Sequence, residues 1–150
     1  MVTAYIERRS SGTAWLDTYA QRLFGARSEQ EIADALLQAT CALVPRGGAA
    51  YRGGRRIAAT GSGLAFPRAD EGTPMDHLRF GTATLTLVAD AAPHPAGSAV
   101  AHLLCDIVAL AATTLEALER RTAMREQLRT LSHRVEDAAG TAGTGMAGTA

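Results

Sequence analysis

The chain of 150 residues contains no lysine and no asparagine, and its 15 basic residues are all arginine. Without lysine the chain cannot form a Schiff base with a carbonyl substrate, and it cannot carry a Walker A phosphate loop. The arginines are balanced by 15 acidic residues, so the formal net charge is zero. Because nucleic-acid binders usually carry a basic excess, this balance predicts that the chain binds no nucleic acid.

Cysteine is scarce and long apolar runs are missing. Cys41 and Cys105 form no CxxC motif and no disulfide framework, and we expect two buried thiols in a reducing cytoplasm. The longest apolar stretch, 99–115, is interrupted by His102 and Asp106, and the first ten residues lack the apolar core of a signal peptide. We therefore predict a cytoplasmic protein that does not enter a membrane.

The first third of the chain predicts two helices. Residues 1–12 are interpreted as a flexible polar lead. A helix that ends at Gly25 follows, because apolar residues recur at spacings of three and four. Ser28 lies three residues before Glu31 and forms a capping box that opens a second helix, which Pro45 stops. The apolar face of the first helix consists of Trp15, Leu16, Tyr19, Leu23 and Phe24.

The middle of the chain changes to the period of two that is typical of strands. Gly53 and Gly54 are a two-residue hairpin signal, and Leu78 and Phe80 alternate with polar neighbours. We predict strands over 49–52, 55–60, 77–80 and 82–89, and loops over 61–76 and 90–97.

The last third predicts one long helix over 98–137. Its first half is broadly apolar and is expected to pack on a core, whereas its second half keeps a narrow stripe with coiled-coil spacing. We predict a homodimer through this stripe, extended by the first helix. The predicted interface consists of Trp15, Tyr19, Leu110, Ala117, Met124, Leu128, Leu131 and Val135. Residues 138–150 are interpreted as a disordered low-complexity tail.

Three segments resemble the GAF domain family, whose members sense small molecules. SEQEIADALLQATCALV leads into GGAAYRGGRRIAATG, like the helix, strand, turn and strand of a GAF domain, and GTATLTLVADAAPHP with the helix after it is similar to its final strand, loop and closing helix. The resemblance covers roughly 13–120, with 121–137 as a protruding helix. It implies an α+β fold, a GAF/PAS-like antiparallel sheet backed by N- and C-terminal helices, and a regulatory, signal-transducing role.

One departure from the family leaves alternatives open. GAF domains place pocket-covering helices between the first hairpin and the later strands, whereas only 61–76 are available here. The first hypothesis is a non-catalytic dimeric sensor that passes its state to a protein partner with an output domain. The second is a scaffold that binds no small molecule. The third is a small enzyme, or an accessory subunit of a biosynthetic pathway, that uses the exposed sheet face.

A possible ligand site lies on the outer face of the predicted sheet. Strand parity groups Arg56 with Ala58 and Thr60, and it groups His77 with Arg79. Arginine can donate paired hydrogen bonds to an anion, although a solvated sheet face gives the same pattern. The candidate ligand-binding residues are Tyr51, Arg56, Phe66, His77, Arg79, Thr84 and Thr86.

The sequence predicts no catalytic residue, cofactor or metal. His102 and Asp106 share a helix face, but zinc usually needs three or four ligands and no second cluster exists. Cys41 and Cys105 lie in predicted helices rather than in pocket loops, which disfavours thiol catalysis. No serine stands in a nucleophile elbow.

Overall fold

The computed structural model describes residues 2–61, 78–90 and 97–149, and the side chains of 13–61, 78–90 and 97–141 among them. The chain divides into two units, Met1–Glu116 and Ala117–Ala150. The elements are α1 (Val2–Gly25), α2 (Glu29–Leu43), β1 (Gly47–Arg52), β2 (Arg55–Gly61), β3 (Leu78–Gly81), β4 (Thr86–Ala89) and α3 (Ala99–Thr149).

The first unit is built on a four-stranded antiparallel sheet with the order β2-β1-β4-β3. The hairpin between β1 and β2 turns at Gly53 and Gly54, whose φ angles are 57° and 83°. Two successive positive φ angles suit the type I′ turn, whose twist matches the strands that it joins. The predicted two-residue hairpin is therefore confirmed, and the α+β class is confirmed with it.

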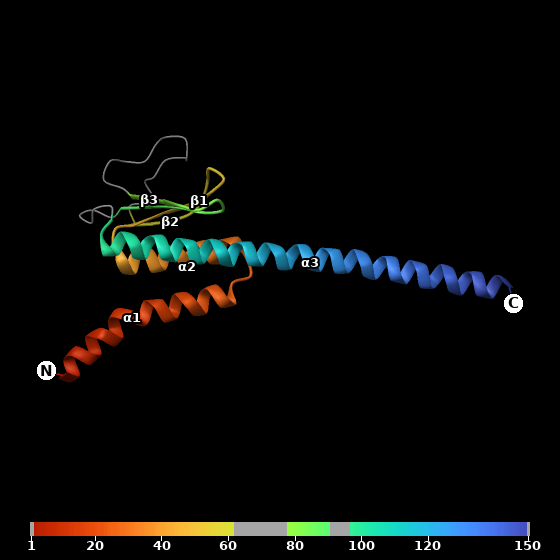
Figure 1. Ribbon diagram of the computed structural model, residues 1–150, viewed down its shortest axis with the longest axis horizontal. Helices are drawn as coiled ribbons and strands as arrows, with labels where there is room; N and C mark the ends of the chain where they lie inside the picture. Colours follow the sequence, from red (N-terminus) through yellow and green to blue (C-terminus); the bar gives the residue numbers. More distant parts are fainter. Residues whose placement is uncertain (1, 62–77, 91–96, 150) are drawn as a thin grey trace. The chain divides into compact units, whose positions relative to one another are not determined.

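Helices cover one face of this sheet in two layers (Figure 1). Helix α2 packs on β1 and β2, and α1 packs on α2 from the side away from the sheet. The Tyr19 hydroxyl of α1 donates a hydrogen bond of 2.5 Å to the Ile107 carbonyl of α3. The Thr84 hydroxyl donates to Glu116 on α3. The first part of α3 is thus bonded both to α1 and to the β3–β4 turn.

The core lies between the sheet and the helices. Leu104, Val108 and Leu115 of α3 are at most 1% exposed, and the inner face of the sheet contributes Ala50 and Leu87. Their spacing of four and seven residues along α3 puts them on one helix face. This packing confirms the prediction that the first half of the last helix covers a core.

The starts of α2 and α3 follow the capping signals in the sequence. Ser28 caps α2, and its hydroxyl accepts a hydrogen bond of 3.2 Å from the Glu31 amide. The Glu31 carboxylate accepts a bond from the Arg27 amide rather than from the Ser28 amide, so the reciprocal half of the box lies one residue earlier. The Ser98 hydroxyl accepts from the Ala101 amide in the same way and opens α3.

All residues of the second unit that the structure describes are helical, because α3 continues through them to Thr149. Every described side chain from Glu119 to Thr141 is exposed. A helix needs tertiary packing for most of its stability, so a single helix whose described side chains are this exposed lacks a core of its own.

Three predicted boundaries were wrong. Residues 2–12, predicted as a flexible lead, are helical in α1, and the predicted disordered tail from residue 138 is helical to Thr149. Both segments lack proline, so nothing in them forces a helix to stop. The strand predicted over 82–89 begins at Thr86. Residues 82–85 form the turn, in which the Thr82 amide donates to the Leu85 carbonyl.

Helix α3 also contains a stretch within Ala99–Thr141 that is long and apolar enough, by length and composition, to span a membrane. Of that window, 39% is buried inside the molecule. Leu104, Ile107 and Val108 in the apolar first part of α3 belong to the core of the first unit. A core helix has the same composition, so the prediction that the chain stays outside membranes remains a prediction.

Candidate functional site

The outer face of the sheet brings together four of the predicted ligand-binding residues. Tyr51 of β1 pairs with Arg56 of β2 on one side and with Thr86 of β4 on the other. Paired residues point to the same side of a sheet, so these side chains share a face. Arg79 of β3 pairs with Val88, which pairs with Ala49, two residues before Tyr51.

The positive charges of Arg56 and Arg79 both act on the Tyr51 phenol. Tyr51 is only 7% exposed, beside the buried Ala49 and Val88. Burial raises the pKa of the Tyr51 phenol, while the positive charges of Arg56 and Arg79 lower it, and burial is the larger effect. Tyr51 and Arg56 also make further interactions within the molecule. The face therefore combines an apolar floor with a phenol and two cations, a combination that suits an anion.

The predicted parity of β2 was wrong at Arg56. The register runs from Ala50 opposite Ala58 to Tyr51 opposite Arg56, so Ile57 is an extra residue on β2. Such a bulge reverses the alternation of the strand beyond it. Arg56 consequently shares the outer face with Ala59, whereas Ala58 lies opposite the buried Ala50 on the inner face.

The two predicted threonines separate. Thr86 lies on β4 beside Tyr51, as expected. Thr84 lies in the β3–β4 turn and bonds to Glu116 of α3, so it does not join the outer face. The turn, which periodicity alone did not indicate, is the reason for this correction. Phe66 and His77 lie outside the described residues.

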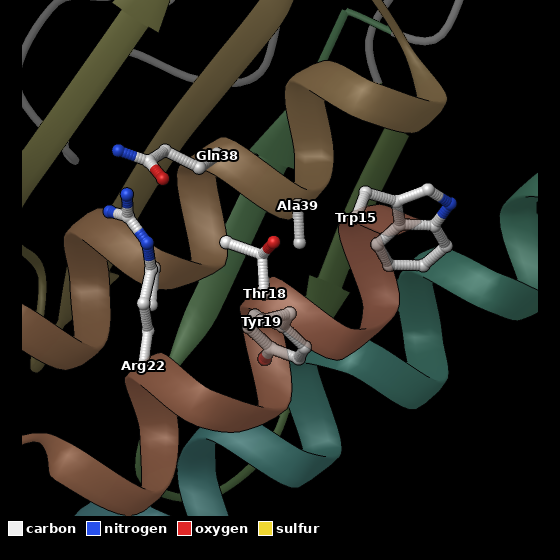
Figure 2. A pocket seen from close by; sticks show the side chains of 7 residues that line it. Trp15, Thr18, Tyr19, Arg22, Gln38 and Ala39 are labelled. Carbon is white, nitrogen blue, oxygen red and sulfur yellow. The ribbon is translucent and has the colours of Figure 1, made fainter. Parts of the chain in front are cut away.

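A small cavity lies between α1 and α2 (Figure 2). Its volume is about 140 Å³. Arg22 and Gln38 lie together at one end, and Trp15 lies at the other. Ligand and cofactor pockets usually have a volume of about 300 Å³ or more, so this cavity suits a few waters better than a cofactor. It is lined by Trp15, Thr18, Tyr19, Arg22, Ala35, Gln38 and Ala39.

Sequence reasoning missed this cavity, and it assigned the aromatic residues differently. Tyr19 was predicted to lie in the dimer interface, but it is 2% exposed and belongs to the chain's own core, as does the neighbouring Leu23 at 4%. Tyr19 is therefore not available to a dimer contact, which corrects that prediction. Trp15 is half-buried at the cavity. The sequence signal that could have indicated the cavity is a set of polar residues at the edge of two apolar helix faces. These residues are Thr18 and Arg22, at i and i+4, and Gln38.

The apolar stripe of the last helix differs between the two units. In the first unit Leu110 is 46% exposed, and in the second unit Ala117 is half-buried. The remaining four predicted residues are each 56–61% exposed. We call these four residues the seam: Met124, Leu128, Leu131 and Val135.

The cysteine and histidine candidates form no site in the described part of the chain. Cys41 is half-buried and its sulfur lies 2.9 Å from the Thr60 hydroxyl, whereas Cys105 is exposed. Two buried thiols were predicted, but Cys105 lies one residue away from the buried stripe of α3. His102 and Asp106 are exposed. Among the described residues, no three His, Cys, Asp or Glu side chains gather closely enough to hold a metal ion.

Comparison of this chain with protein-family models, with curated proteins and with solved structures finds no match.

Proposed function

We propose that this chain is a non-catalytic, regulatory interaction module whose second unit pairs with another helix. The observation that carries the proposal is the exposed seam of α3. Met124, Leu128, Leu131 and Val135 follow one another at spacings of four, three and four residues, the spacing of facing positions in a coiled coil.

The physical argument is that the seam leaves apolar surface in water. Full burial of one such side chain contributes about 1.5–3 kcal/mol, and each seam residue keeps more than half of its surface exposed. A second helix laid along the seam would remove much of that surface from water. The stripe is narrow and polar residues surround it, which is typical of a helix that pairs with one partner.

The regulatory part of the proposal rests on the order of the elements. Helix α2, the β1–β2 hairpin, later antiparallel strands and a closing helix follow one another as the GAF resemblance implies. Because α3 belongs to both units, a change in the first unit can alter the population of paired helices. Sensing of a small anion on the outer face at Tyr51, Arg56 and Arg79 stays an alternative input. Our proposal places the chain in the cytoplasm.

A designed peptide tests the pairing. The peptide consists of about four heptads with leucine at the facing positions and glutamine at the flanking positions. We expect it to bind the full chain in a fluorescence anisotropy titration, and we expect Leu128→Glu to weaken that binding at least about tenfold. Glutamate favours helices nearly as well as leucine, so circular dichroism of the variant should stay unchanged.

Thr130→Glu is the matched control, because it adds the same charge two residues away on the side of α3 that faces away from the seam. We expect its affinity for the peptide to stay within about twofold of that of the unmodified chain. A self-associated chain that Leu128→Glu returns to a monomer in sedimentation would also support pairing at the seam. A chain that stays monomeric and binds no heptad peptide, whatever the charge of the peptide, would overturn the proposed function.

A further inference from the structure

The spacing of the seam residues defines a heptad frame, and this frame gives every residue around the seam a position from a to g. Leu128 and Val135 take the a positions, and Met124 and Leu131 take the d positions, so Arg121 also falls at an a position. The e and g positions flank the seam and decide which partner fits. These flanking residues are Arg120, Arg125, Gln127, Ser132 and Arg134, and all are exposed. Three flanking positions are therefore cationic and none is acidic.

The acidic residues of the second unit lie on the other side of the helix. Glu119 and Glu126 fall at f positions, and Glu136 falls at a b position. On that side of the helix, the Glu126 carboxylate forms an ion pair with Arg129 at 3.2 Å. The Glu136 carboxylate lies 3.8 Å from the His133 ring. The charges are thus sorted, with cations beside the seam and acids away from it, although the helix as a whole is nearly neutral.

A second copy of the chain does not complement this pattern. In a parallel pair, Arg121 faces Arg121 at the a position, and Arg120 faces Arg125 across the g and e positions. Like charges at facing positions repel. In an antiparallel pair no register gains an ion pair, because neither the e nor the g positions of the seam carry an acid. The predicted homodimer is therefore disfavoured by the charges that would flank it.

A membrane surface also fits poorly. Helices that lie on membranes combine a wide apolar face with aromatic residues and a strongly basic polar face. The seam is narrow and has no aromatic residue, and Glu119, Glu126 and Glu136 would stand on the polar face. A lipid surface is therefore a less suitable partner than a helix, and binding to vesicles is measured beside binding to the peptides.

Resting on the proposed function, we infer that the partner of the seam is an amphipathic helix of a different protein, with apolar residues at a and d and with aspartate or glutamate at e and g. Arg121 is the one charged residue that the heptad frame places at a core position of the pair. An aspartate or glutamate of the partner opposite Arg121 would compensate this charge. Arginine suits such contacts because its planar guanidinium binds carboxylate oxygens in pairs.

Three heptad peptides with identical leucine cores test this inference. Their flanking positions carry glutamate, glutamine or arginine. We expect the glutamate peptide to bind the full chain about tenfold more tightly than the glutamine peptide at low salt, and the arginine peptide to bind most weakly. Raising the salt to about 1 M should remove most of the difference, because the screening length then falls to about 3 Å.

Variants that neutralise single arginines or groups of arginines show which of them cause the preference for the glutamate peptide. The triple variant Arg120→Gln, Arg125→Gln and Arg134→Gln should lose most of the preference for the glutamate peptide and still bind the glutamine peptide. The matched control is Arg129→Gln, which removes one arginine from the side of the helix that faces away from the seam. It should keep the preference of the unmodified chain.

Several results would overturn the inference and leave the proposed function standing. One is equal affinity for the glutamate and glutamine peptides. Another is a homodimer in sedimentation that Leu128→Glu dissociates. Tighter binding to phosphatidylserine vesicles than to the glutamate peptide, lost in Leu128→Glu, would replace the partner helix with a lipid surface, and unlike the other results it would overturn the proposed helix pairing as well. Binding of the glutamate peptide that the triple variant does not weaken would also overturn it.

Discussion

Two leucines of the same helix show how differently the two units use apolar residues. Leu104 lies in the first unit and is fully buried between the helices and the sheet, whereas Leu128 lies in the second unit and is 58% exposed. Both belong to apolar patterns with helical spacing. The comparison teaches that the spacing identifies an apolar face but not its occupant, because the occupant depends on what else the chain brings to that face.

The largest expected effect on stability tests this comparison between Leu104 and Leu128 directly. Leu104→Ala should lower the free energy of unfolding by about 2–5 kcal/mol, because it leaves a cavity in a closed core. Leu128→Ala should change it by less than about 0.5 kcal/mol, because the side chain contacts mostly water. Urea unfolding followed by the fluorescence of Trp15, the single tryptophan, measures both. Equal losses for the two variants would mean that the seam is already covered.

A second pair of variants tests the backbone of the packed unit. Gly47 has a φ of 78°, and a Cβ there would meet the backbone oxygen of Thr60. Gly47→Ala should therefore cost about 2 kcal/mol or more in the free energy of unfolding, from conformational strain and the clash together.

Gly53→Ala is its control, since Gly53 also has a positive φ, of 57°, but a Cβ there meets nothing within 4 Å. We expect a loss of about 1–2 kcal/mol, from conformation alone. If both variants unfold at the same urea concentration, the close approach of β1 and β2 at Gly47 adds nothing to the loss of stability that Gly47→Ala causes.

The smallest expected effect concerns the bond between α1 and α3. Tyr19→Phe removes the hydrogen bond to the Ile107 carbonyl and keeps the buried ring, so we expect a loss of about 1 kcal/mol and a melting temperature a few degrees lower. Differential scanning calorimetry measures this change. An unchanged melting temperature would show that the bond makes no net contribution.

The same tyrosine should make stability depend on alkaline pH. Burial raises the pKa of the Tyr19 phenol above its ordinary value of 10.0, so the folded chain keeps a proton that the unfolded chain releases. The resulting stabilisation is complete below pH ~10 and is lost as the pH rises further. Urea unfolding at pH ~8 and pH ~11 should therefore show a steeper loss for the unmodified chain than for Tyr19→Phe. Parallel losses would contradict this assignment.

Local signals predicted the elements well where one side chain acts on the nearby backbone. The Ser28 cap, the glycines of the β1–β2 hairpin and the Ser98 start of α3 were all readable, because each acts within a few residues. The outer-face site was predicted in part. Tyr51 and Arg79 were placed on the correct elements, but no local signal marks the bulge at Ile57 that brings Arg56 to their face.

The long-range assignments were harder. Tyr19 belongs to an apolar face whatever covers it, and the sequence does not say whether the cover is the chain's own α3 or a partner. Thr84 has the alternation of a strand residue, yet its turn is held by bonds between Thr82 and Leu85. Such choices depend on contacts between residues far apart in the chain or on competing local bonds, which periodicity does not resolve.

By itself, the amino-acid sequence determined the absence of lysine chemistry, the α+β class, the starts of α2 and α3, and the heptad frame that puts arginines beside the seam and acids away from it. These properties depend only on residue identity and on the fixed geometry of helices and strands. The tertiary structure alone decided which apolar faces are covered. It buried Tyr19 and Leu104, paired Arg56 with Tyr51 across a bulge, and left Leu128 exposed, because burial depends on whether the rest of the chain supplies a surface that fits.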